Sequence, residues 1–376
     1  MHYFAITTPT LQRAITVLVA IILTVILVRL ADKIQPRLYT FRWHKISGRI
    51  QLKVVWLVTG TLVAIIVLLG IGLIDGDYPI PASKAIATAL WDRNGEYDFI
   101  INSLRFPRIV VAILAGMCFA SSGLIFQSLI NNPLVSPDVI GINSGAAVLA
   151  VAILAAGGNI GYLPWAAFLG ALLTAGLIYL LSWKRGVSAT RLVLVGIGVN
   201  SLLGAVITFI TVKYPIERVI AAARWQAGTL FGASWGDVRT LLIGLFVLLP
   251  SAFFLTNRLR VLQLGDETAI TVGSRIERDR LALLAVASLL AALAVSVVGP
   301  LGFVALIVPQ AARLLVGSIT GGVLIFTAFL GGFFLLGADL IAQRLFAPVM
   351  LPAGVITATF GGPYFLYLLA RYNRAN

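Results

Sequence analysis

Cysteine, histidine and acidic residues are all scarce in this sequence, whose 376 residues include one cysteine, two histidines and 14 Asp and Glu. The single cysteine, Cys118, excludes an intramolecular disulfide. His2 and His44 are too few for a histidine metal site. No lysine is followed by Ser or Thr, so the P-loop signature is absent and we do not expect the chain itself to bind ATP.

Charge is also sparse, at 11% of residues, whereas 60% are hydrophobic and the mean hydropathy is +1.00. A soluble core cannot hide this much apolar surface, so the composition predicts an all-α, polytopic membrane helix bundle. The net charge of +14 does not indicate nucleic-acid binding. The basic residues lie in short loops between apolar runs, where the positive-inside rule places them in a multi-pass membrane protein.

About ten apolar runs are long enough to be spans. The predicted spans are 54–74, 109–129, 142–156, 163–181, 192–212, 241–255, 281–298, 301–316, 322–342 and 353–369. A further run, 14–30, predicts an extra N-terminal span. We therefore divide the chain into an N-terminal extension, 1–50, and one membrane domain, 51–376.

The densest basic segment is 33–53, with Lys33, Arg37, Arg42, Lys45, Arg49 and Lys53. The positive-inside rule places it in the cytoplasm. The mixed-charge segment 75–104 then lies outside and the C-terminus inside, and basic residues are nearly twice as numerous inside as outside.

The segment 257–280 carries an unusual concentration of charge between two spans: Arg258, Arg260, Asp266, Glu267, Arg275, Glu277, Arg278, Asp279 and Arg280. Asp266 is predicted to cap a short helix over 267–272, and Gly273 to end it in a left-handed turn. Ser274 and Glu277 have capping-box spacing for a second short helix. These short helices would dock a soluble cytoplasmic partner. The alternative is a solvated linker.

Two arginines flank Pro107 at the outer end of one span, and Arg344 lies at the outer end of another. Arg105, Arg108 and Arg344 could pair with carboxylates of a partner or reach lipid phosphates. Asp339 is the clearest acid inside a span, which makes it a functional candidate unless it pairs with nearby Arg344.

On the inner side, Pro133 is predicted to push Asn132 out of the helical conformation at the end of a span. Non-helical backbone at that depth needs protein or water around it. Asn132, Pro133 and Leu134 therefore predict either a constriction of a passage or a plain helix stop.

Five segments together resemble the FecCD-type permease family. They are 104–108 (LRFPR), 127–134 (QSLINNPL) with Pro137 and Gly141, 264–267 (LGDE) with Gly273, 299–304 (GPLGFV) with Val308-Pro309, and 351–354 (LPAG) with 361–363 (GGP). The resemblance spans roughly 51–371. Members are membrane subunits of ATP-driven importers for ferric siderophores, haem and cobalamin. The residues of several segments are most similar to those of ferric enterobactin permease subunits.

The resemblance implies roles for particular residues. Arg105, Arg108 and Arg344 would receive carboxylates of the substrate-binding protein. A cytoplasmic gate would consist of Asn132, Pro133, Leu134, Ala189 and Thr190, although Ala189 replaces a hydroxyl residue of a related member. Coupling to the ATPase would involve Leu264, Gly265, Asp266, Glu267, Gly273, Ser274 and Glu277. Gln310 stands where the family usually has His, which is compatible with a structural hydrogen bond there.

The implied partners are a cytoplasmic ATP-binding subunit, an extracytoplasmic siderophore-binding protein and a second permease subunit, with a heterodimer favoured over a homodimer. This chain would bind no cofactor and would not be an enzyme. Three alternatives remain. The chain could serve haem or cobalamin; it could be an ion-coupled secondary transporter, which would need more midplane acids than Asp339; or it could be an aspartyl protease using Asp138 and Asp339, which are predicted to lie far apart.

Overall fold

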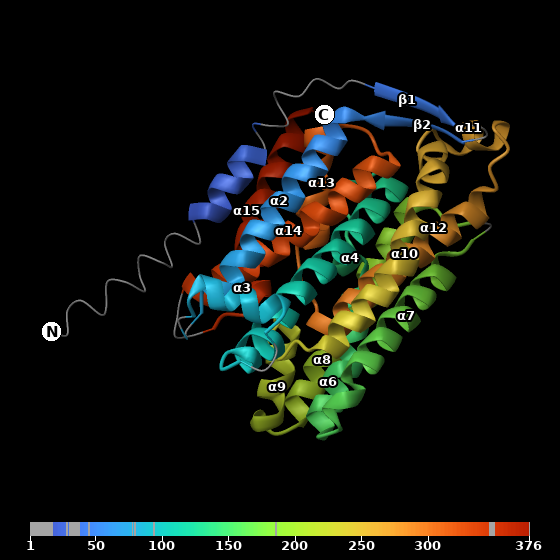
Figure 1. Ribbon diagram of the computed structural model, residues 1–376. Helices are drawn as coiled ribbons and strands as arrows, with labels where there is room; N and C mark the ends of the chain where they lie inside the picture. Colours follow the sequence, from blue (N-terminus) through green and yellow to red (C-terminus); the bar gives the residue numbers. More distant parts are fainter. Residues whose placement is uncertain are drawn as a thin grey trace.

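The computed structural model describes residues 18–375, with gaps at 28, 30–37, 44–45, 77, 79, 93–94, 185 and 346–349. Within these residues the membrane domain is a bundle of helices, most of them roughly parallel to one axis (Figure 1). This confirms the predicted fold class. Ten helices cover the ten predicted spans: α2 (Leu52–Ile74), α4 (Phe106–Ile130), α6 (Ile142–Ala156), α7 (Leu163–Ser182), α8 (Ala189–Lys213), α10 (Trp235–Leu262), α12 (Ile276–Val298), α13 (Val304–Val316), α14 (Gly321–Leu345) and α15 (Ala353–Ala375).

Seven of the helices in the described part of the chain are long and apolar enough to cross a membrane. Of the other three predicted spans, α6 and α13 are shorter apolar helices, and α15 is not among the seven. The loops carry further short elements: α3 (Ala82–Leu90), a π-helix (Phe99–Arg105), α5 (Pro137–Ile140), a 3-10 turn (Ile160–Tyr162), α9 (Ile216–Gln226) and α11 (Asp266–Thr271). The short elements α3 and α9 lie at one end of the bundle and α11 at the other (Figure 1). We call these ends the α9 face and the α11 face.

The central helix is α4, whose span is 89% buried and which packs against α14, α12, α13 and α10. Small residues allow this packing, as the sequence indicated. A Cβ added to Gly116 would lie 2.3 Å from the carbonyl oxygen of Gly331, and one added to Gly123 would lie 1.9 Å from that of Ala305. The backbones of α4, α13 and α14 are therefore in direct contact.

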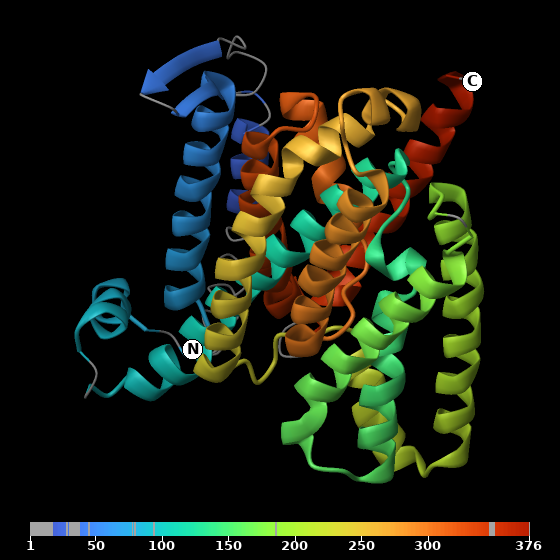
Figure 2. The same ribbon diagram turned by 90° about the vertical axis from the view of Figure 1, so that its right-hand side faces the viewer.

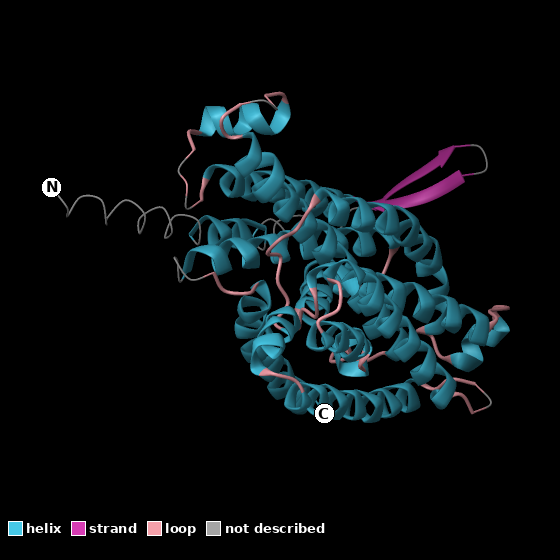
Figure 3. Cartoon of the chain, turned by 90° about the horizontal axis from the view of Figure 1, so that it is seen from below, coloured by secondary structure: helices cyan, strands magenta, loops and turns pink. Residues whose placement is uncertain are grey.

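A β-hairpin precedes α2 and was not predicted. Strands β1 (Leu38–Trp43) and β2 (Ile46–Gln51) pair antiparallel, with Leu38 opposite Gln51. The hairpin extends beyond the outline of the helices at the α11 face (Figure 3). Within the described residues, Leu18–Leu27 form a separate apolar helix. The rest of the run 14–30, except Arg29, lies outside the described residues, so the extra span and the division at residue 50 stay predictions.

Candidate functional site

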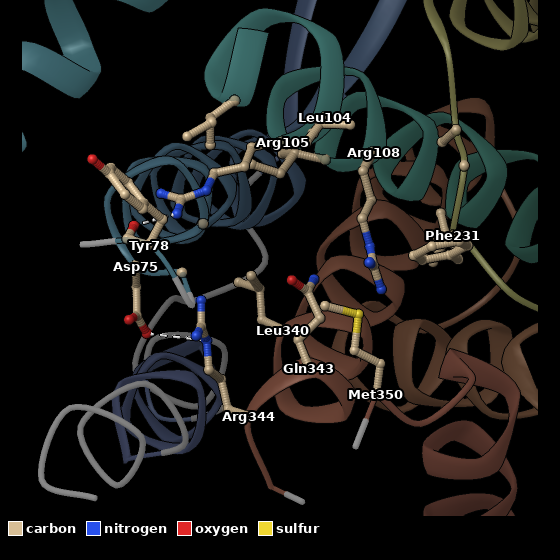
Figure 4. Close-up of a pocket in the computed structure, with 17 residues that line it drawn as sticks. Asp75, Tyr78, Leu104, Arg105, Arg108, Phe231, Leu340, Gln343, Arg344 and Met350 are labelled. Carbon is tan, nitrogen blue, oxygen red and sulfur yellow. Dashed lines mark hydrogen bonds and ion pairs between the residues drawn. The ribbon is translucent and has the colours of Figure 1, made fainter. Parts of the chain in front are cut away.

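The three predicted docking arginines gather around one cavity of about 360 Å³ at the α9 face (Figure 4). Arg105 and Arg108 come from the start of α4 and Arg344 from the end of α14. Apolar side chains, including Phe231 and Met350, complete the lining. Each guanidinium already has a partner within the chain.

Arg105 caps the C-terminal end of α2. Its Nη1 donates to the carbonyl oxygens of Leu73, at 2.7 Å, and Ile74, at 3.2 Å. Its Nη2 donates to the carbonyl oxygen of Tyr78 at 2.7 Å. The last carbonyls of a helix have no intrahelical donor and carry partial negative charge, so a cation is stabilising there. Arg105 therefore fixes the connection that leaves α2.

Arg108 pairs with the fully buried Asp339 of α14. Its Nε and Nη2 donate to the two carboxylate oxygens at 2.9 and 2.8 Å. Gln343, one turn after Asp339, donates to the same carboxylate at 2.8 Å. The expected pairing of Asp339 with Arg344 was therefore wrong. Arg344 instead lies 3.3 Å from a carboxylate oxygen of Asp75, beyond the end of α2.

Three guanidiniums and one carboxylate, that of Asp75, line this cavity, and Asp339 is buried behind Arg108, so positive charge is in excess at the opening. Partners that an arginine holds at the rim of a cavity can exchange for carboxylates of another protein. The Asp75–Arg344 pair is the more accessible of the two carboxylate contacts, since 17% of the Asp75 side chain is exposed and none of the Asp339 side chain.

The opposite end of the bundle carries α11. It begins at Asp266 itself, after Gly265 with φ of +96°, so Asp266 is not its cap. Gly273 has φ of +81°, as the predicted left-handed turn requires. The prediction of a second short helix was wrong, because the residues after Gly273 lead into the long helix α12, which begins at Ile276. The loop thus contains one surface helix beside the end of a span.

The predicted capping box does not form either. The Ser274 hydroxyl donates to a carboxylate oxygen of Asp279 at 2.9 Å, and the residue before the first turn of α12 is Arg275. Glu277 instead accepts the main-chain N–H of Val187 at 3.3 Å. Asp279 also pairs with Arg258 of α10. Sequence reasoning missed the roles of Asp279, Arg280 and Arg258, although the density of charge pointed to the segment.

Three large apolar side chains beside α11 are exposed: Leu264, Ile270 and Val272, each by more than 60%. The acidic residues Asp266 and Glu267 open the same helix and are exposed as well. Clustered apolar side chains surrounded by charge are typical of a protein-binding surface.

The candidate gate residues lie in two turns. α4 ends at Ile130, and Asn131 adopts a left-handed conformation with φ of 53°, one residue earlier than predicted. The Asn132 side chain accepts the N–H of Leu134 at 2.9 Å, which fixes the turn around Pro133. Ala189 and Thr190 begin α8, where Ser188 accepts the N–H of Arg191. Among the described residues, no hydrogen bond joins the two turns.

Close to Gln310, the structure shows a buried polar network that the sequence did not predict. Pro309 has no N–H, so the carbonyl of Ala305 lacks its helical donor. Gln127 of α4 donates to Ala305, at 3.3 Å, and to Leu306, at 3.0 Å. Its own carbonyl accepts from Arg313 at 3.1 Å. The structural hydrogen bonds in this region are thus made by Gln127.

Other sites find no support in the described residues. Asp138 lies in α5, between the α11-face ends of α4 and α6, whereas Asp339 lies towards the α9-face end of α14, so these acids do not form a catalytic pair. Within the residues the structure describes, no group of three His, Cys, Asp or Glu could hold a metal ion.

The model of the FecCD transport family matches residues 62–371. A ferric enterobactin transport system permease, FepG of Escherichia coli K12, is 38% identical and covers 83% of this chain and 95% of its own. A probable siderophore permease, YfhA of Bacillus subtilis 168, is 39% identical over 84% and 94%. The cobalamin import permease BtuC of Halobacterium salinarum is 42% identical over 72% and 73%.

Among solved structures, an inward-facing metal-chelate type ABC transporter matches with a TM-score of 0.74 and 24% identity, covering 84% of this chain and 99% of that one. At that identity the match supports the fold of the bundle.

Proposed function

Because the chain belongs to the FecCD transport family, we propose that it is the permease subunit of an ABC importer for a ferric siderophore of the catecholate, enterobactin-like class. The family and the relatives establish the coarser statement, a membrane permease of an ABC importer for iron chelates, haem or cobalamin. The single observation that carries the finer one is the identity of 38% to an enterobactin permease over 95% of its length. The membrane would be the bacterial cytoplasmic membrane.

The energy would come from a separate ATP-binding subunit at the α11 face. The sequence lacks a P-loop lysine, and α11 presents exposed Leu264 and Ile270 beside Asp266 and Glu267. The coupling residues expected from the sequence, from Leu264 to Glu277, lie in α11, in the turns on either side of it and in the first turn of α12. The exposed apolar side chains favour a protein-docking surface over the alternative interpretation, a solvated linker.

The substrate-binding protein would dock at the α9 face. Arg105, Arg108 and Arg344 border the same cavity, and their forked guanidiniums suit carboxylates that must bind and release. Asp75 holds Arg344 in the meantime and would be displaced by an acidic side chain of the binding protein.

The passage would run between this chain and a second permease. α8 stands at the edge of the bundle (Figure 2), and only 11% of its span is buried. Ser201 and Thr208 are exposed on this helix, Thr211 is half-buried, and all three hydroxyls donate to carbonyls of the same helix. A helix face that contacts only lipid carries few hydroxyl groups, whereas an interface that contains water accommodates them. Asn132, Pro133, Leu134, Ala189 and Thr190 would narrow the passage at the α11 face.

An ion-coupled transporter is the weaker reading. Asp339, the buried acid of the spans on which that reading depends, is neutralised by Arg108 and held by Gln343. A coupling acid must lose and regain a proton or cation. A carboxylate fixed by an arginine fork is poorly suited to that exchange.

The test is uptake of radiolabelled substrates by a strain lacking this gene and by the complemented strain. Ferric catecholate, ferric hydroxamate, haem and cobalamin are compared, each with and without an ionophore that collapses ion gradients. We expect uptake of ferric catecholate that needs ATP and survives the ionophore. Uptake of haem or cobalamin alone would overturn the substrate class, and ionophore-sensitive uptake without an ATPase would overturn the mechanism.

A further inference from the structure

The first turn of α12 connects elements that are otherwise separate at the α11 face. Arg280 makes contact with Asp266 at the start of α11, at 3.0 Å, and with Glu277 on its own helix, at 3.7 Å. It also donates to the main-chain carbonyl of Val187, in the turn between α7 and α8. A single side chain thus joins α11, α12 and the α7–α8 turn.

Val187 is held at both of its main-chain polar groups. Its N–H donates to Glu277 at 3.3 Å, and its carbonyl accepts from Arg280. The residue is 2% exposed and pairs with Trp183 across the turn. Gly186, with φ of +119°, allows the approach, because a Cβ there would lie 2.5 Å from the Glu277 carboxylate. The left-handed backbone favours glycine at this position, and the missing side chain leaves room for the Glu277 carboxylate.

This turn determines where α8 begins. Ser188, the residue after Val187, caps α8, and Ala189 and Thr190 form its first turn. The rest of α8 packs against α5, α6 and α7, while only 11% of its span is buried. The turn held by Glu277 and Arg280 is therefore the place where α8 is joined to α12 through charged side chains. Asp279 anchors the other side of the junction through Arg258 of α10 and Ser274.

We propose that Glu277 and Arg280 are positioning residues that carry a displacement of α11 to the start of α8, by holding both main-chain groups of Val187. The inference rests on the proposed function, in which an ATP-binding subunit engages α11. A hydrogen bond to a charged group is stronger than a neutral one, and Val187 is held by two of them, so the turn should move with α12. The carboxylate of Asp266 extends the same connection to α11.

The experiment uses the full importer complex in lipid nanodiscs and proteoliposomes. Arg280→Gln removes the charge and the fork, and Glu277→Gln removes the charge but keeps an acceptor for the Val187 N–H. Arg278→Gln is the matched control, because Arg278 is an exposed arginine on the same turn. Spin labels replace Val55 on α2 and either Leu194 on α8 or Thr271 on α11, all exposed, in a Cys118→Ala background.

We expect ATP to change both label distances in the parent protein and in Arg278→Gln. In Arg280→Gln the α11 distance should still change, whereas the α8 distance should not. Substrate imported per ATP hydrolysed should fall about tenfold, with ATP hydrolysis retained. Glu277→Gln should lie between the two. A fold-stabilising role alone would lower thermal stability without separating the two distances.

The proposal is overturned if Arg280→Gln and Glu277→Gln show the parent's α8 movement and the parent's import per ATP. If Arg280→Gln does not fold, Glu277→Gln and Arg280→Lys decide the question by the same readouts. Failure of the proposed function would look different, because the parent complex itself would then import no ferric chelate.

Discussion

Arg108 and Asp339 join α4 and α14 through a two-point ion pair whose carboxylate is fully buried. Arg108 lies in the first turn of α4 and Asp339 about two turns before the end of α14, and Gln343 also donates to the carboxylate. The same two helices touch through their backbones at Gly116 and Gly331. The ion pair therefore fixes, near one end, a helix pair that small residues bring together in the middle.

Removing one member of this pair should destabilise the bundle. Arg108→Gln leaves the Asp339 carboxylate buried without its cation, a change that costs about 3 kcal/mol in other proteins. We expect a lower unfolding temperature in detergent. Arg260→Gln, at an exposed arginine, is the control. The double variant Arg108→Met, Asp339→Leu should recover much of the loss, and a double variant less stable than Arg108→Gln would contradict this account.

The Asp75–Arg344 pair gives a test of docking at the α9 face. If Arg344 accepts a carboxylate of the binding protein, Asp75→Asn should strengthen the complex, because the internal competitor is removed. Arg344→Gln should weaken it about tenfold, and more at low salt than at high salt. Binding to the permease in nanodiscs measures both. The two variants should change the affinity for the binding protein in opposite directions. If the pair were purely structural, both variants would lower that affinity.

Gln127 and Pro309 should depend on each other. Gln127→Leu leaves the buried carbonyl of Ala305 without a donor, which costs about 1–3 kcal/mol. Pro309→Ala restores an N–H at the position that normally bonds to that carbonyl. The double variant should therefore be more stable than Gln127→Leu alone. A thermal-unfolding cycle measures the coupling, and simple additivity of the two changes would refute the compensation.

Charge reversal on α11 should separate assembly from folding. Glu267→Lys alters an exposed acid of the predicted ATPase-docking surface, so thermal stability should change little while substrate-dependent ATP hydrolysis and uptake fall together. Glu217→Lys, an exposed acid on α9 at the opposite face, is the matched control for thermal stability and for ATP hydrolysis measured without the binding protein. Normal transport by the Glu267→Lys protein would remove this residue from the coupling surface.

Much of the fold could be predicted, because membrane spans are a local property of the sequence. Runs of apolar residues about 20 long identify helices wherever they lie in the bundle. The predicted span 109–129 lies within α4, and 322–342 lies within α14. The hairpin Leu38–Gln51 was not predicted, because its strands are defined by pairing with each other, and the basic residues of the segment do not indicate that pairing.

Pairing between distant residues was the part that the sequence could not give. Asp339 and Arg344 are neighbours in sequence, but five positions place them about 140° apart around a helix, so they face different partners. Gln343, four positions on, shares the face of Asp339 and bonds to it. Glu277 has capping-box spacing to Ser274, yet the main chain of Val187 holds it.

The sequence alone determined that this chain is a membrane helix bundle of the FecCD type, with charge confined to its ends. Each apolar run and each motif is a short stretch of sequence that can be read without knowing the packing. The tertiary structure decided that Arg108 pairs with Asp339 and that Gln127 replaces the N–H that Pro309 lacks. It also decided that Glu277 and Arg280 bind the main chain of Val187, in the turn before α8. Each of these contacts joins segments brought together only by helix packing, where a buried polar group takes whichever partner the packed bundle puts within reach.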